Sequence, residues 1–124
     1  VANALPAAMK EVPGCKMTLE SDSKNHLSLL EESDSVGEVE LSRDNNYFTI
    51  AIDGDRSGES EDRALQRVAH MTLAAVLACN SDYDYEKAQD VAVEIIEADG
   101  EYRDGGVSYR AGTKGYQYVL RVYL

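Results

Sequence analysis

The chain has 124 residues, of which 23 are acidic and 12 are basic, and its formal net charge is −11. This length suits one ordinary domain, and a hydrophobic content of 44% favours a folded core over a disordered chain. The acidic balance argues against nucleic-acid binding, because phosphate contacts need an excess of Lys and Arg. No apolar run reaches the about 18 residues of a membrane-spanning helix, so we expect no membrane insertion.

The first fourteen residues contain both prolines, Pro6 and Pro13. Proline is poorly tolerated inside helices and strands, so this stretch predicts an N-terminal arm outside the core. Residues 15–124 are then expected to form a single α+β domain.

Two hairpins are expected after the arm. Residues 16–20 and 26–31 alternate apolar and polar side chains on either side of a polar turn, which is typical of paired strands. Residues 36–42 and 47–53 alternate in the same way around a cluster of Asp and Asn, and they predict the second hairpin.

The period of apolar residues changes from two to about 3.6 after Glu59, which predicts an amphipathic helix that ends near Cys79. A second helix is expected from about Tyr83 to Ala98, followed by a hairpin of residues 107–110 and 116–124. The resulting order, ββββ-αα-ββ, predicts an antiparallel sheet with one face covered by the two helices.

The two cysteines, Cys15 and Cys79, are an even number in a small chain that starts at Val1 without an initiator Met. We interpret them as a disulfide, which predicts a periplasmic or extracellular location and a processed or trimmed N-terminus. Two buried, reduced thiols are the alternative interpretation.

The segment after the second hairpin imitates a calcium-binding loop. Oxygen-bearing side chains alternate along it, at Asp53, Asp55, Ser57, Glu59 and Glu61. A ligand or calcium carrier is therefore one alternative function. Position 12 of such a loop should be Glu and is Ala64, so a turn followed by the acidic start of a helix explains the same residues.

Catalytic motifs are not evident. Neither Cys lies within a short spacing of a His, and the carboxylates are so numerous that none is singled out. A carboxylate-based hydrolase remains a further alternative, but we expect no catalytic residues, no cofactor and no chemistry of the protein's own.

Seven of the eight tyrosines lie from Tyr83 onward, and the last twenty residues carry three bases but no Asp or Glu. Along the final strand Tyr116 and Tyr118 share one face, whereas Arg121 and Tyr123 share the other. One interpretation is that Tyr116 and Tyr118 complete the core while Arg121 and Tyr123 lie in solvent. The other is that a Tyr and Arg platform on the exposed sheet face meets a protein or glycan partner. The candidate binding residues are Tyr109, Tyr116, Tyr118, Arg121, Tyr123, Glu38 and Glu40.

The charge is also uneven along the chain, because residues 31–62 carry eleven acids against two bases and residues 82–104 carry nine against two. We expect this acidic surface to bind a protein partner with a basic surface, in the manner of an inhibitor, immunity or adaptor protein. Arg110 and Arg121 are expected to pair with glutamates on neighbouring strands. A homodimer through the final strand, if it lies at the sheet edge, is a further expectation.

Overall fold

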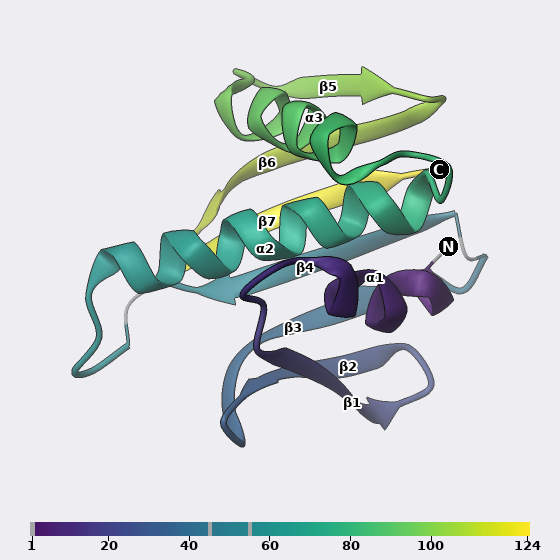
Figure 1. Cartoon of the computed structure of the whole chain (residues 1–124). Coiled ribbons are helices and arrows are strands. Elements are labelled where there is room, and N and C mark those ends of the chain that lie inside the picture. Colours follow the sequence, from purple (N-terminus) through teal and green to yellow (C-terminus); the bar gives the residue numbers. More distant parts are fainter. Residues whose placement is uncertain (1, 45, 55) are drawn as a thin grey trace.

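The computed structural model describes residues 2–44, 46–54 and 56–124. Within these residues one antiparallel sheet has seven strands in the order β1-β2-β3-β4-β7-β6-β5, and the helices lie on one of its faces (Figure 1). The strands are β1 (Met17–Ser23), β2 (His26–Glu31), β3 (Asp34–Leu41), β4 (Tyr47–Asp53), β5 (Glu101–Asp104), β6 (Val107–Lys114) and β7 (Gln117–Tyr123). The helices are the 3-10 helix η1 (Ala2–Ala4) and the α-helices α1 (Leu5–Glu11), α2 (Glu61–Cys79) and α3 (Tyr85–Glu97).

The predicted α+β class and the four strands, two helices and C-terminal strands in that order are confirmed. The sequence-based expectation missed β5, a strand of four residues. Gly105 and Gly106 both have positive φ and form the two-residue turn between β5 and β6. A Gly-Gly pair between short strands is a recognised hairpin signal, so this strand was detectable in principle.

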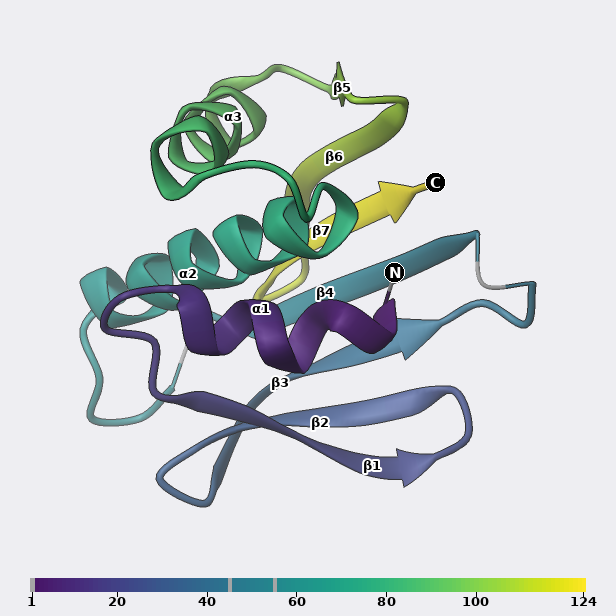
Figure 2. The same cartoon turned by 45° about the vertical axis from the view of Figure 1, so that its right-hand side comes forward.

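The helices divide the covered face of the sheet among them. α1 lies on the side of β1, α2 lies over the central strands β4 and β7, and α3 lies against β5 and β6 (Figures 1 and 2). Alternate strand residues such as Phe48, Ile50 and Val122 point toward the helices and are buried. No helix in the described part of the chain is long and apolar enough to cross a membrane.

The N-terminal segment belongs to the core, so the expectation of an arm outside it is wrong in this respect. Leu5 is fully buried, and Met9 and Val12 join the same hydrophobic cluster as the sheet. Pro6 lies in the first turn of α1, where a backbone N–H has no hydrogen-bond partner within the helix, so its absence costs nothing. Pro13 follows the end of the helix. Both prolines therefore delimit a packed helix.

The predicted disulfide is not formed, and Cys15 and Cys79 are both free thiols. Gly14, next to Cys15, lies against the imidazole of His70. Cys79 lies nine residues further along α2, and at a rise of 1.5 Å per residue this is about 13 Å along the axis. The predicted oxidising compartment loses this support and stays a prediction.

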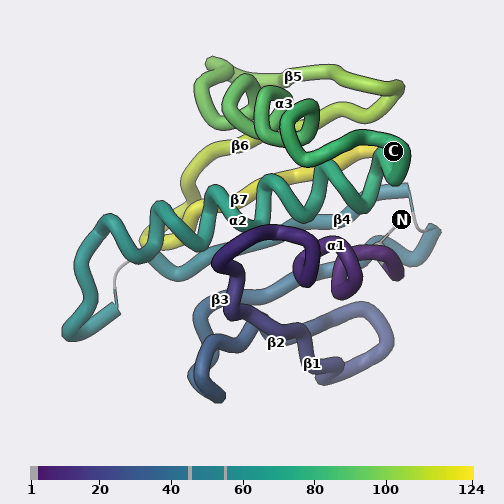
Figure 3. Tube along the Cα trace, in the orientation of Figure 1, coloured from purple at the N-terminus to yellow at the C-terminus, as the bar shows by residue number. Residues whose placement is uncertain are grey.

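The final strand is not a sheet edge. Figure 3 shows the chain returning after β6 so that β7 lies next to β4, and β7 pairs with β4 on one side and β6 on the other. Its Val119 and Leu120 point to opposite faces and are both buried, as suits an interior strand. The edges are β1, which has an irregular register between Ser21 and Ser23, and the short β5.

Candidate functional site

An apolar groove opens between the helices and the sheet and has a volume of about 240 Å³. Its floor consists of strand residues, among them Ile50 and Ile52 of β4 and Leu120 of β7. Val68 and Met71 of α2 form one wall. The groove exists because α2 and α3 cover adjacent parts of the sheet and leave the junction between them only partly filled.

Two apolar side chains at the mouth of this groove remain in water. Leu65 of α2 is 45% exposed and Ile96 of α3 is 44% exposed. Leu65 continues the apolar stripe of α2 toward its N-terminus. Exposed apolar side chains next to an apolar hollow are typical of surfaces that bind another molecule.

The rim of the groove carries carboxylates. The hydroxyl of Tyr118, which also lines the groove, donates to Glu61 at 3.4 Å. Tyr118 and Thr113 also line an adjoining, more polar hollow that contains Glu59 and Glu61. On α3, the exposed Glu94 and Glu97 flank Ile96 in the sequence. The groove therefore combines an apolar floor with an acidic surround.

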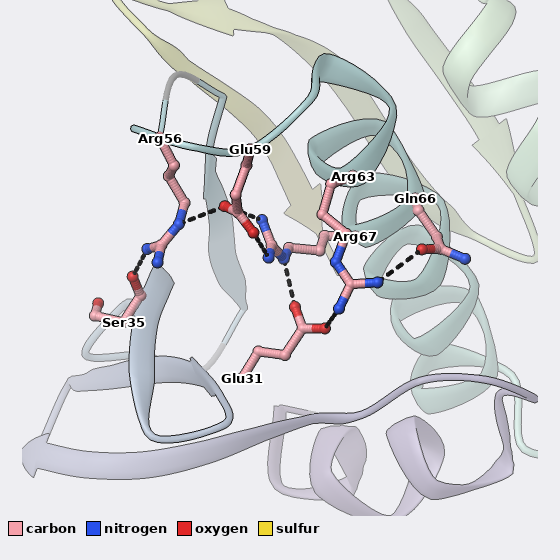
Figure 4. Close-up of polar contacts among 7 residues, drawn as sticks. All are labelled: Glu31, Ser35, Arg56, Glu59, Arg63, Gln66 and Arg67. Atoms are coloured by element: carbon pink, nitrogen blue, oxygen red, sulfur yellow. Dashed lines mark hydrogen bonds and ion pairs between the residues drawn. The ribbon is translucent and has the colours of Figure 1, made fainter.

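A buried ion-pair network holds the N-terminal half of α2 in place (Figure 4). Arg67 donates to Glu31 of β2 at 2.5 Å and to both carboxylate oxygens of Glu59, at 2.5 and 3.1 Å. Arg63 donates to the other oxygen of Glu31, and Arg56 donates to Glu59 at 2.6 Å. This network connects α2 to the end of β2 and to the preceding loop.

The same contacts occupy the loop proposed for calcium. The hydrogen bond from Arg67 is the main cause that lowers the pKa of Glu59 to about 2. Asp53 accepts a hydrogen bond from Gln117 at 3.0 Å. Ser57 lies in the turn before α2, and Asp55 lies outside the described residues. A carboxylate already held by two guanidinium groups is a poor calcium ligand, and these contacts disfavour that alternative.

The predicted binding residues lie in different environments. Tyr109 is fully buried and accepts a hydrogen bond from Asn80, so no surface partner can reach it in this fold. Tyr116 is exposed and Tyr118 lines the groove, whereas Arg121 and Tyr123 lie on the opposite face of the sheet. The candidate tyrosines therefore do not share one surface, and only Tyr123 lies on the face of Arg121.

Glu38 and Glu40 of β3 lie on the uncovered face beside His26 of β2. Ligand atoms of these three residues lie within 4.8 Å of one another, so they could together hold a divalent cation. The ring nitrogens of His26 each lie 3.1 Å from a carboxylate oxygen, one of Glu38 and one of Asp22. The hydrogen bond with Glu38 is the main cause that raises the pKa of His26.

Comparison with protein families, curated proteins and solved structures found no match for this chain. The geometry alone must therefore indicate the function.

Leu65 and Ile96 were not singled out from the sequence. Leu65 belongs to the apolar stripe of its helix, which predicts a buried side chain. Ile96 directly follows the buried Ile95, and the sequence does not show which of the two is exposed. Their exposure depends on where α2 and α3 sit on the sheet, and no local pattern encodes that position.

Proposed function

We propose that this chain is a protein-binding domain whose groove receives apolar side chains from a basic segment of a partner protein. The observation that carries the proposal is the combination of an apolar floor with exposed Leu65 and Ile96 at the mouth and carboxylates around it. Inhibitor, immunity and adaptor proteins act by binding of this kind.

The size of the groove favours side chains over a whole small molecule. Its volume is about 240 Å³, whereas pockets that enclose drug-sized ligands or cofactors measure about 300–1,000 Å³. A half-open hollow of this size suits one or two large apolar side chains that remain attached to a larger partner. Such buried anchors supply most of the binding energy in protein interfaces.

The charge around the groove favours a basic partner. The outer surface of α3 exposes Glu86, Asp90, Glu94 and Glu97, and α2 begins with Glu61 and Asp62. Charges at the rim of an interface mainly raise the association rate and suppress partners of the same sign. We therefore expect binding that is faster at low salt.

A pair of leucines provides a matched test. Leu65 and Leu124 have similar exposure, 45% and 40%, but only Leu65 lines the groove. The probe is an amphipathic helical peptide of Leu and Lys, and binding is measured by calorimetry. Leu65→Asp is expected to weaken binding at least about tenfold, because it places a charge at an apolar anchor point. Leu124→Asp is expected to bind like the original protein.

The charge requirement has its own control. A second peptide carries Glu in place of every Lys and is expected not to bind. Equal binding of both peptides, or undiminished binding of the first peptide to Leu65→Asp, would refute the proposal. Capture of native partners with the original protein and with Leu65→Asp in parallel would then identify the partner.

The alternatives from the sequence have less support. The calcium carrier would need carboxylates that Arg56, Arg67 and Gln117 already contact. A hydrolase would need an acid with a raised pKa, whereas Glu59 and Glu101 both have lowered pKa values. Secretion to a periplasmic or extracellular location remains part of the proposal.

A further inference from the structure

In the described part of the chain, one face of the sheet carries no helix. Figures 1 and 2 show all the helices on the other side. The strand register places every second residue of each strand on the side without helices, which we call the open face. It includes Glu38 and Glu40 of β3, Thr49 of β4, Arg121 of β7 and Arg110 of β6.

The open face is divided by charge. Among the described strand residues, its β1–β3 half carries the acids Glu20, Asp22, Glu38 and Glu40, and His26 lies among them. Its β7–β6–β5 half carries four bases, Arg103, Arg110, Lys114 and Arg121, against one acid, Glu101. The sequence shows a basic C-terminal segment, but only the sheet order places that segment on one side of an otherwise acidic face.

The acidic and basic halves do not pair with each other within one chain, although in the basic half Arg103 pairs with Glu101 at 2.8 Å. Glu40 and Arg121 are both paired in register with Thr49 of β4, on opposite sides of it. Two strand spacings, about 10 Å, therefore separate them. Among the described residues Arg110 and Arg121 form no ion pair, although Glu101 lies opposite Arg110. Arg110 and Arg121 instead lie directly opposite each other, an unfavourable pairing of like charges.

The middle of the open face is mostly uncharged. Ala51 and Val119 lie opposite each other on β4 and β7. At one end of these strands the rings of Tyr47 and Tyr123 contact each other, with centroids 4.6 Å apart. At the other end Asp53 accepts the hydrogen bond from Gln117. A face with a neutral, partly aromatic centre and two oppositely charged sides is complementary to a copy of itself.

We propose that the open face binds a second copy of this chain and forms a twofold symmetric dimer. With the symmetry axis in the interface and parallel to β4 and β7, the acidic half of each copy meets the basic half of the other. Glu38 and Glu40 then face the arginines of the partner copy. An axis across the strands would place acid on acid, so the charge pattern selects the first arrangement. The result is an aligned sandwich of two sheets.

The available area is sufficient for a modest interface. Seven strands about 4.8 Å apart and about 20 Å long cover roughly 700 Å² on each copy. Stable interfaces bury about 800 Å² per partner, and sheet twist reduces the contact. The net charge of −11 on each copy also opposes their approach. We therefore expect a dimer that forms at high micromolar or lower millimolar concentration.

Sedimentation velocity over a range of concentration tests the dimer. The double variant Arg110→Glu/Arg121→Glu makes both halves of the face acidic. It is expected to weaken dimerisation roughly a hundredfold or more, because like charges then meet at two symmetric places. Lys10→Glu/Lys87→Glu makes the same change in net charge on α1 and α3, away from the open face, and is expected to dimerise nearly as the original does.

A charge swap decides between this arrangement and any other. Glu38→Arg/Glu40→Arg removes the net charge of the acidic half and places two arginines against the basic half of the second copy, so this variant is expected to be monomeric alone. Mixed with Arg110→Glu/Arg121→Glu, it is expected to form a heterodimer, which also shows that both variants are folded. A monomeric original protein at millimolar concentration, or two variants that do not associate with each other, would overturn the proposal.

Discussion

Replacing Arg67 by Ala is expected to cost far more stability than any other single change in the network around it. The Arg67 side chain is 6% exposed and the Glu31 side chain is 9% exposed. Arg67 reaches Glu31 with one bond and Glu59 with two. Its removal leaves the buried Glu31 carboxylate without its main partner, and breaking such a pair costs about 3–5 kcal/mol.

Arg63 is the matched control because it donates to the same carboxylate, Glu31. The Arg63 side chain is 41% exposed, so water already weakens its ion pair with Glu31. Exposed ion pairs contribute about 0–1 kcal/mol, and Arg63→Ala should cost no more than that. For a domain of this length about 4 °C in melting temperature corresponds to 1 kcal/mol. The expected losses are therefore roughly 12–20 °C for Arg67→Ala and below about 4 °C for Arg63→Ala.

Thermal and urea unfolding followed by circular dichroism measure both variants. The combined Arg67→Met/Glu31→Leu variant adds a second comparison, since removing both charges avoids an unpaired buried carboxylate. It should be more stable than Arg67→Ala alone. Equal losses for Arg67→Ala and Arg63→Ala, or a loss below about 1 kcal/mol for Arg67→Ala, would show that burial does not control the energy of this network.

Three further outcomes are expected. The Glu59 carboxyl has a lowered pKa in the folded state, about 2 against 4.5. The stability that this carboxylate gives the folded protein is complete above pH 4.5 and is lost as the pH falls toward 2. Glu59→Gln should therefore flatten the acid-unfolding curve over this pH range. Burial raises the pKa of the thiols of Cys15 and Cys79. A thiol reagent should therefore label both without reductant, slowly in the folded protein and quickly in denaturant. No labelling in denaturant would indicate a disulfide. Leu5→Ala should lower the free energy of unfolding by about 2–5 kcal/mol if α1 is part of the core, whereas a loss under about 1 kcal/mol would indicate a detachable arm.

Local patterns account for most of the secondary structure. Alternation of apolar residues located β4 at its observed bounds, and the 3.6 period located α2 and α3 to within two residues. These signals are strong because each element buries one side, and that side repeats with the geometry of the element itself. Segment 1–14 was misinterpreted because proline marks both loops and first helical turns, and sequence alone does not distinguish them.

Composition and local patterns were enough to predict the fold class, the acidic character and the basic, tyrosine-rich C-terminal segment. The positions of these features relative to one another depend on the tertiary structure. The register of β6 with β7 puts Tyr109 in the core and Tyr123 on the open face, and strand order places Arg110 and Arg121 on the side of this face away from its acidic half. The packing of α2 beside α3 creates the groove. Both depend on contacts between residues far apart in the chain, which neither composition nor periodicity encodes.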